Sequence, residues 1–314
     1  MITIEPYNAA MAAEWDAFVA ESRNATFLLR RGYMDYHSDR FSDFSLVARD
    51  ARGHIVALLP ACREGSTVWS HRGLTYGGWI MPSRRCDVLD MLDVWSAMED
   101  YLRAAGIDTL VYKPAPHIYH TRPAEEDLYA LFRSGAVLTS SLASSVIDLN
   151  NPIAFDQGTR QRVRRVLASD ISFGPSTDWD GYWAVLSALL RDRYDARPVH
   201  TCDEIKMLAE RFPDNIRLYT ATLGDEILGG IVLYVTPTVA HSQYAAASPR
   251  GKELSVLHGL YQRLIEEYTG RIRYFDFGTS AEADAPRGLN EGLIRQKCSY
   301  GGRTVLYNTY TLRL

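Results

Sequence analysis

Apolar residues recur along this chain with two periods, and together they predict a mixed α/β protein. Apolar positions three or four residues apart predict helices over residues 11–22, 88–106, 124–135, 150–170, 179–194, 201–212, 252–270 and 290–302. Alternating or short continuous apolar runs bounded by turn residues predict strands over residues 2–7, 44–50, 54–64, 67–80, 107–113, 136–149, 171–175, 216–224, 226–238, 239–248, 271–280 and 304–314.

The order of these elements nearly repeats once along the chain. Each half reads as helix, antiparallel strands, long helix, strand, helix and strand, although no sequence identity between the halves is visible. The Asn-Asn-Pro run at residues 150–152 interrupts the strand before it. We therefore expect two domains, residues 1–149 and 150–314, each with a mixed, largely antiparallel sheet flanked by helices.

Composition limits the classes of function. The net charge of −4 disfavours a protein that coats nucleic acid, because such proteins need a basic footprint, and it excludes DNA as a favoured partner. No run approaches the length of a membrane span, and no secretory leader precedes the first strand. Four scattered cysteines form no C-x-x-C pair. A cytoplasmic protein without a bound metal is expected.

Several common catalytic motifs are missing from the sequence. It contains no phosphate-binding loop of the G-x-x-x-x-G-K-[ST] type, no strand-linked G-x-G-x-x-G, no G-x-S-x-G and no H-E-x-x-H. No sequence motif therefore supports nucleotide hydrolysis, dinucleotide redox chemistry, serine hydrolysis or zinc proteolysis.

Two polar segments in the first half are candidate binding surfaces. The loop after the strand at 107–113 offers four side chains, Lys113, His117, Tyr119 and His120, for a ligand, and simple loop packing is the alternative. The stretch SHRGLTYGG brings His71 and Tyr76 together with three glycines, which mark either a bulge or the close approach of a ligand.

The helix that opens the second half carries Arg160 and Arg164 four residues apart, on one face. Arginine pairs of this kind either face solvent or clamp a phosphate or carboxylate, since the guanidinium offers two parallel donors. Both interpretations remain open.

The end of the chain carries the most specific pattern. The segments QYAAAS at 243–248, YFDFGTS at 274–280 and K-x-x-x-G-G at 297–302, with the duplicated α/β order, resemble the Fem-type branch of the GNAT acyltransferase superfamily, in which two GNAT-like domains are joined. SHRGLTYGG and YKPAPHIYH also look like segments of a bacterial GNAT-like subgroup. The resemblance covers nearly the whole chain and implies acyl transfer to an amine.

The resemblance also implies roles for residues. The strand QYAAAS would present its backbone to the donor's carbonyl, Tyr244 would be the acid, Asp276 the base or a group that orients the amine, and Lys297 would meet phosphate or developing negative charge. Ser280 and Asn290 would line the same cleft. The simpler alternative is that Asp276 caps a turn and Lys297 is a solvated helix residue.

The resemblance leaves the donor open. Acyl-CoA enzymes of the superfamily carry an [RQ]-x-x-G-x-[GA] loop, and SPRGKELSVLHG lacks that spacing. The net acidic charge and the absence of a long helical arm disfavour aminoacyl-tRNA. We therefore expect an N-acyltransferase with no permanently bound cofactor, whose co-substrate is acyl-CoA or aminoacyl-tRNA and whose acceptor is an amine of a small molecule or cell-envelope precursor. The alternative is a non-catalytic duplicated module that binds an anionic ligand between its domains.

Overall fold

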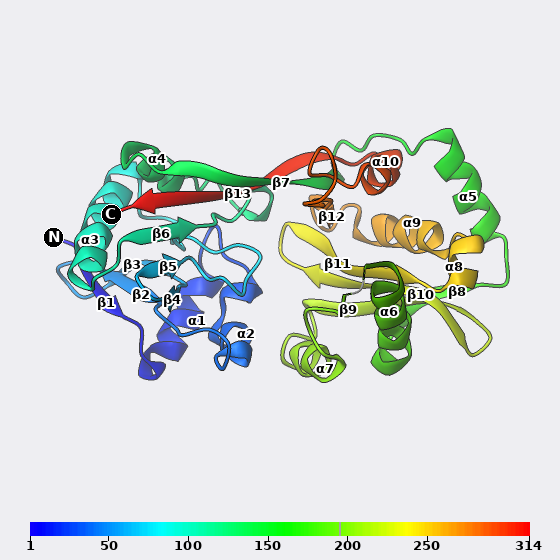
Figure 1. Ribbon diagram of the computed structural model, residues 1–314, viewed down its shortest axis with the longest axis horizontal. Coiled ribbons are helices and arrows are strands. Elements are labelled where there is room, and N and C mark those ends of the chain that lie inside the picture. Colours follow the sequence, from blue (N-terminus) through cyan, green and yellow to red (C-terminus); the bar gives the residue numbers. More distant parts are fainter. Residues whose placement is uncertain (195) are drawn as a thin grey trace. The chain divides into compact units, whose positions relative to one another are not determined.

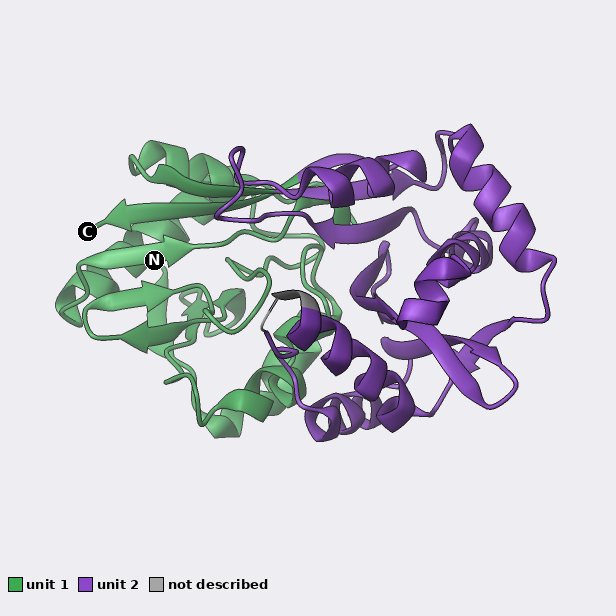
Figure 2. Cartoon of the chain, turned by 45° about the vertical axis from the view of Figure 1, so that its right-hand side comes forward, with its two compact units in different colours: residues 1–142, 306–314 green, residues 143–305 purple. Residues whose placement is uncertain are grey.

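The chain divides into two compact units in a computed structural model that describes residues 1–194 and 196–314 (Figures 1 and 2). Unit 1 contains residues 1–142 and 306–314, and unit 2 contains residues 143–305. Two long strands, β7 (Val137–Asp148) and β13 (Arg303–Arg313), have residues in both units.

The sequence-based division at residues 149 and 150 differs from this one in two places. It keeps all of β7 in the first domain and all of β13 in the second. In the structure the end of β13 pairs antiparallel with β6 (Thr109–Tyr112) of unit 1, from Tyr310 opposite Tyr112 to Arg313 opposite Thr109. This pairing joins residues about two hundred positions apart, and nothing in the local pattern indicates it.

Unit 1 holds two sheets and four α-helices among its described residues. β1, β2 and β3 form an antiparallel sheet, and the order of the second sheet is β4-β5-β6-β13-β7, with β5 and β6 parallel. The further elements of unit 1 are β1 (Thr3–Pro6), α1 (Ala12–Ala20), α2 (Arg31–Met34), β2 (Leu46–Arg49), β3 (Ile55–Leu59), β4 (Cys62–Glu64), β5 (Thr67–Trp69), α3 (Val88–Ala104) and α4 (Glu126–Arg133).

Helix α3 shows why this sequence forms a helix and which face is buried. Asp87 caps its first turn, and its side chain accepts hydrogen bonds from the N–H groups of Leu89 and Asp90 while Asp90 reaches back. The apolar face that packs into the core of unit 1 consists of Met91, Val94, Trp95, Met98 and Leu102. Burial of this stripe holds the helix on the sheet.

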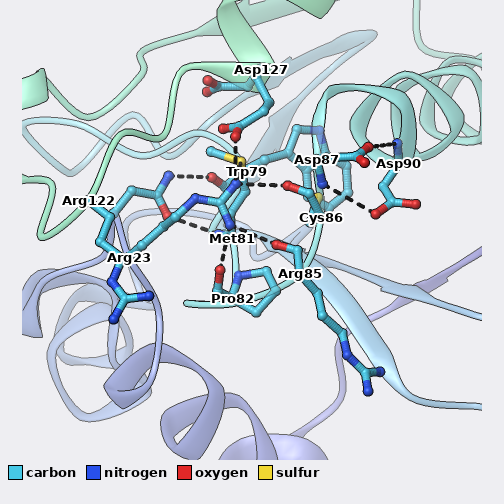
Figure 3. A network of polar contacts seen from close by, with 12 residues as sticks. Arg23, Trp79, Met81, Pro82, Arg85, Cys86, Asp87, Asp90, Arg122 and Asp127 are labelled. Carbon is cyan, nitrogen blue, oxygen red and sulfur yellow. Dashed lines mark hydrogen bonds and ion pairs between the residues drawn. The ribbon is translucent and has the colours of Figure 1, made fainter.

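A buried arginine ties together the loop before α3 and the start of α4 (Figure 3). The guanidinium of Arg23 donates to the carbonyl oxygens of Pro82 (2.5 Å), Arg85 (2.7 Å) and Cys86 (2.8 Å). It also lies 2.9 Å from a carboxylate oxygen of Glu126, and the Arg23 side chain is only 7% exposed. Backbone oxygens and one carboxylate therefore satisfy this buried cation.

The strand predicted over residues 67–80 is wrong beyond Trp69. The ladder ends there, and the following residues form a loop in which His71 has a left-handed backbone (φ 66°) and Gly78 also has positive φ (81°). Left-handed residues cannot continue a strand, so the apolar and aromatic residues of this stretch pack as a loop instead.

Unit 2 contains one sheet with helices on both faces. The strand order is β7-β12-β11-β10-β9-β8, where β11 and β12 are parallel and the other described pairs are antiparallel. The elements are α5 (Gln157–Leu167), β8 (Ser172–Ser176), α6 (Trp179–Tyr194), α7 (Cys202–Arg211), β9 (Ile216–Leu223), β10 (Glu226–Val235), β11 (Val239–Ala247), α8 (Pro249–Glu253), α9 (Val256–Tyr268), β12 (Tyr274–Thr279) and α10 (Glu291–Ser299).

Alternate residues of the central strand β10 show which helix covers each face of the sheet in unit 2. Ile231 belongs to the core with Leu260 and Leu264 of α9, while a Cβ placed on the neighbouring Gly230 would strike the ring of Tyr182 in α6. Since successive strand residues point to opposite faces, α9 covers one face and α6 the other. Glycine at 230 lets α6 approach closely.

The single helix predicted over residues 252–270 is wrong at its start, because Ser255 interrupts it. Ser255 has a left-handed backbone (φ 61°), which separates the short α8 from α9. The apolar period continues across the break, so the hydrophobic pattern alone cannot reveal it.

Candidate functional site in unit 2

The two parallel strands of unit 2 separate after three paired residues. β11 and β12 pair from Val239 opposite Tyr274 to His241 opposite Asp276, and both strands continue without further pairing to one another. On its other side β11 has a bulge, since Val232 and Leu233 of β10 pair with Tyr244 and Ser242. Gln243 is the extra residue, and the backbone around it is therefore not committed to a regular ladder.

Asp276 lies at the last pair before this separation and is completely buried. One carboxylate oxygen lies 2.9 Å from Nδ1 of His241, and the other accepts from Oγ of Ser144 (2.5 Å) and the N–H of Gly278 (2.8 Å). Its exposed fraction of 0% leaves no surface from which it could touch an amine. The geometry instead supports a role in orienting His241.

Lys297 of α10 is 6% exposed and closes over the end of β12. Its ammonium donates to the carbonyl oxygens of Gly278 (2.7 Å) and Thr279 (2.9 Å) and to Oγ of Ser280 (2.9 Å). Burial lowers the pKa of Lys297 to about 8, against the attraction of Asp276. Three donors meet three acceptors, so Lys297 fixes the conformation of this strand end.

Ser280 and Asn290 also lie at this strand end, in supporting positions. Ser280 is buried, and its carbonyl oxygen accepts from the N–H of Asn290 at 2.9 Å. The Asn290 side chain caps α10 by accepting from the N–H of Leu293. The structure therefore brings Asp276, Ser280, Asn290 and Lys297 together at this strand end.

Tyr244 lies on β11 just past the bulge and contacts two aromatic residues. Its hydroxyl oxygen is 2.6 Å from Nδ1 of His200, and its ring meets the indole of Trp183 edge-on at 5.3 Å. His200 is 5% exposed and precedes α7, which begins with a capping box from Thr201 to Glu204. The capped turn holds His200 against the tyrosine.

Helix α6 forms a wall of two cavities in unit 2. One, of about 530 Å³, is lined by Trp183, Ser187, Arg191, Ala196, Arg197, Pro198, His200, Thr201 and Cys202. The other, of about 680 Å³, is lined by Ala184, Val185, Ala188, Leu189, Asp192, Ala247, Ser248, Pro249 and Lys252. The first is adjacent to the contacts of Tyr244, whereas the second follows the end of β11 and is mostly apolar.

In unit 1 the corresponding parallel strands, β5 and β6, also pair over three residues, ending with Trp69 opposite Val111. Here the chain itself fills the space beyond, because Ser70 accepts from the N–H of Lys113 (2.7 Å) and Gly77 donates to the Lys113 carbonyl (2.8 Å). The Lys113 ammonium donates to the carbonyl of Leu74 at 2.5 Å, and burial lowers the Lys113 pKa to about 8.

His71 lies within this same loop of unit 1. Its ring stacks on that of His37 at 5.2 Å, and burial lowers the pKa of His71 to about 3. The imidazole is therefore neutral and packed, and its environment is that of an interior group rather than of an anion site.

The aromatic residues predicted near this loop lie together in unit 1. The rings of Tyr76 and Tyr119 are 4.6 Å apart, and the Tyr119 hydroxyl is 2.8 Å from that of Tyr307. His120 lies 2.9 Å from the carbonyl oxygen of Ala115, and burial lowers its pKa. His117 begins a short 3-10 turn and is exposed. Of this group, His117 has the most accessible side chain.

Arg160 and Arg164 lie on exposed positions of α5, and the buried Val163 and Val166 lie on another face of the helix. The structure does not bring this pair into contact with Asp276, Tyr244 or Lys297 within the described residues. Among those residues it also shows no cluster of three histidine, cysteine or acidic side chains suited to a metal ion.

Two histidines of the site were missed by sequence reasoning. His241 lies two residues before the quoted QYAAAS segment, and His200 is more than forty residues from the tyrosine it contacts. The available signal was a histidine inside an otherwise small and apolar strand, VAHSQYAAAS. Its partner could be named only once the register of β11 and β12 was known.

Comparison with known proteins agrees with this geometry. Residues 155–284 match the family model described as acetyltransferase (GNAT) domain. This segment is similar to a GNAT domain. The matched segment includes His241, Tyr244 and Asp276 but ends before Lys297, and the superfamily recognised from the closing motif is confirmed. No curated protein sequence is similar enough to count as a match.

Solved structures extend the likeness to the whole chain. FemX matches with a TM-score of 0.69 at 12% identity, covering 99% of this chain and 97% of that one. L-PGS from Bacillus licheniformis matches with a TM-score of 0.65 at 12% identity (98% and 93%), and a tandem GNAT protein from the clavulanic acid biosynthesis pathway with 0.51 at 13% (100% and 98%). The predicted fold of two tandem GNAT-like domains is confirmed. At these identities the likeness concerns the fold alone.

Within the described residues, every helix is too short or too polar to cross a bilayer.

Proposed function

We propose that this protein is an N-acyltransferase whose reaction takes place in unit 2. The observation that carries the proposal is the separation of β11 and β12 after His241 and Asp276, next to the bulge at Gln243. An unpaired strand backbone of this kind can offer an N–H group to the carbonyl oxygen of an acyl donor. That donor hydrogen bond stabilises the negative charge that develops in the tetrahedral transition state.

The two cavities beside α6 suit the two substrates of such a reaction. The apolar cavity of about 680 Å³ continues from the end of β11 and has Ser248 and Lys252 in its lining. It fits the flexible arm of a thioester donor, with a cation near an anionic group of the carrier. The cavity of about 530 Å³ lies beside the contacts of Tyr244 and is the place proposed for the amine acceptor.

The side chains around the separated strands are proposed to supply the acid of the reaction and the groups that position other residues. Tyr244 is the proposed acid that protonates the leaving group, since it lies on β11, whose end at Ala247 lines the donor cavity. Asp276 and Lys297 are proposed to act through other groups, because both are buried and hydrogen-bonded. The acyl donor favoured by the apolar cavity is an acyl-CoA, and aminoacyl-tRNA is the alternative donor.

The test combines binding with product formation. Purified protein is mixed with acetyl-CoA, with longer acyl-CoAs or with aminoacyl-tRNA, and both the melting temperature and acyl transfer to a panel of primary amines are measured. The variant Ala188→Trp fills the donor cavity, and Ala209→Trp fills a third cavity, of about 840 Å³, that the proposal does not use. We expect acyl-CoA to raise the melting temperature of the wild type and of Ala209→Trp but not that of Ala188→Trp.

Other outcomes decide between the remaining interpretations. Transfer from aminoacyl-tRNA without any response to acyl-CoA would keep the reaction class and change the donor. Binding of an anionic donor without product from any amine would instead identify the protein as a non-catalytic binding module. If both tryptophan variants lose the response to acyl-CoA equally, the assignment of the donor cavity is wrong.

A further inference from the structure

His241 and Asp276 form a hydrogen-bonded pair at the point where β11 and β12 separate. They are directly opposite each other in the register, so their side chains share one face of the sheet. Nδ1 of His241 lies 2.9 Å from a carboxylate oxygen of Asp276, and the histidine side chain is 14% exposed while the aspartate is 0% exposed. One member of the pair is therefore accessible, and the other is not.

The contacts of the carboxylate fix the tautomer of the histidine. An ionised carboxylate only accepts hydrogen bonds, so Nδ1 of His241 carries the proton that it donates to Asp276. Nε2 is then the nitrogen with the free lone pair. Ser144 and the N–H of Gly278 hold the aspartate from its other oxygen, so the carboxylate cannot rotate freely toward a substrate.

The edge of the ring that carries Nε2 is bordered by a glycine. A Cβ added at Gly278 would lie 3.4 Å from Cε1 of His241 and 4.0 Å from Nε2. Gly278 has positive φ (78°), and Lys297 binds its carbonyl oxygen. The strand end is thus held in a conformation in which residue 278 places no side chain against this edge of the imidazole.

We propose that His241 is the catalytic base of the acyl transfer and that Asp276 is the residue that positions it. This inference rests on the proposed function, and it assigns the proton-accepting step to a histidine that the sequence motifs do not mark. A buried carboxylate behind the imidazole favours the protonated ring that forms during the reaction, as in other aspartate–histidine pairs.

The step balances in atoms and charge. As the amine nitrogen bonds to the carbonyl carbon of the acyl donor, one N–H proton passes to Nε2 of His241. Collapse of the tetrahedral intermediate breaks the bond from carbon to the sulfur or oxygen of the carrier, and that atom takes a proton from the Tyr244 hydroxyl. The imidazolium then releases its proton to solvent, and Tyr244 recovers one from solvent.

The test uses a substitution that separates the two nitrogens of the ring. In His241→Asn the amide nitrogen takes the place of Nδ1 and can still donate to Asp276, but nothing replaces Nε2. We expect kcat for transfer from acetyl-CoA to a primary amine to fall about 100-fold or more, with little change in either KM. The matched control is His54→Asn, because His54 also pairs with an aspartate through Nδ1 (3.3 Å to Asp50) but is exposed in unit 1.

The tautomer supplies a readout that a structural role would not change. In ¹⁵N-histidine spectra, His241 should carry its proton on Nδ1 in the wild type. A proton on Nε2, or full activity in His241→Asn, would overturn the assignment.

These results also separate the two proposals. If the wild-type protein transfers acyl groups and His241→Asn does so equally well, only the catalytic base is wrong. If the wild type transfers nothing to any amine from any donor, the proposed function fails and the assignment of His241 fails with it.

Discussion

The ammonium nitrogen of Lys297 lies 2.7 Å from the carbonyl oxygen of Gly278, so a helix side chain holds the end of strand β12. This contact explains why the chain returns a lysine to the strand that precedes its last helix. The acceptors are peptide and hydroxyl oxygens rather than a carboxylate, and they do not fully offset the loss of water around the charge. Burial accordingly lowers the pKa of Lys297 to about 8.

Lys297→Met should reveal the free-energy cost of burying the ammonium, because the substitution changes how protein stability depends on pH. The lysine binds its proton less tightly in the folded protein (pKa about 8) than in the unfolded chain, where the ordinary value is near 10.5. Between these values the unfolded state holds more protons, so Lys297 should contribute a rise of up to about 3 kcal/mol in the free energy of unfolding as pH increases. The methionine variant should lack this contribution and keep the rise that comes from Lys113, whose pKa burial also lowers to about 8.

Urea denaturation at pH 7 and pH 10 measures the effect. Arg295→Met, on the same helix, is the control, since its guanidinium pairs with Glu291 at the surface and should show the wild-type rise. A constant difference between wild type and Lys297→Met over this pH range would contradict the assigned burial cost.

Gly278→Ala should damage both the fold and the site. The left-handed backbone at Gly278 costs an L-residue about 1–2 kcal/mol, and the new Cβ would touch the His241 ring at 3.4 Å. Gly270→Ala is a matched control, because Gly270 has the same φ of 78° and an added Cβ would meet nothing within 4 Å. Both variants should lose similar unfolding free energy in urea, while only Gly278→Ala should lose acyl transfer. Equal activity in the two variants would show that Gly278 is needed only for its backbone conformation and not for the space beside His241.

The fold was largely predictable because its signals are local. The apolar stripe and capping box of α3 mark that helix in the sequence, and the apolar run of β10 marks a central strand. The loop that follows Trp69 was not predictable in this way. Its residues have the apolar and aromatic character of a strand, and only the positive φ of His71 and Gly78 turns them out of the ladder.

The candidate site was predictable only in part, and for a different reason. Asp276, Ser280 and Lys297 lie close in sequence, so the closing motif names them together. His241 meets Asp276 through strand register, across thirty-five residues, and the bulge at Gln243 is a property of the pairing with β10. Neither register nor bulge can be derived from hydrophobic period, so the partner of Asp276 was missed.

Arg23→Leu should strongly destabilise unit 1. The substitution leaves the carbonyl oxygens of Pro82, Arg85 and Cys86 without their donor (Figure 3). It also leaves Glu126 without its cation. Breaking a buried charged network by removing one partner costs about 3–5 kcal/mol. The control, Arg122→Leu, removes an exposed side chain with one bond of 3.3 Å to Ser83 and should change stability by about 0.5 kcal/mol or less. Similar urea midpoints for the two variants would contradict a structural role for Arg23.

A buried acid should make unit 1 less stable as the solution becomes more alkaline. Asp127 of α4 is 3% exposed and accepts a hydrogen bond from the Tyr112 hydroxyl at 2.6 Å. Burial raises the pKa of Asp127 to about 7, above the usual value near 3.9 of the unfolded chain. Between these values the folded state holds the additional proton, so the free energy of unfolding should fall as pH rises from about 4 to about 7.

Asp127→Asn tests this sign, because the amide cannot ionise and still offers an oxygen to Tyr112. Relative to the wild type, the variant should gain up to a few kcal/mol of unfolding free energy between pH 5 and pH 8, whatever its stability at pH 5. The measurement is the difference in unfolding free energy at the two pH values, followed in urea by tryptophan fluorescence. The tryptophans include Trp79, whose backbone N–H donates to the Tyr112 hydroxyl at 2.6 Å. Asp127 and Lys297 titrate in different pH ranges. The double variant Asp127→Asn, Lys297→Met should therefore lose both contributions to the pH dependence of the unfolding free energy. A variant that keeps the wild-type slope between pH 5 and pH 8 would mean that Asp127 is already ionised in the folded protein.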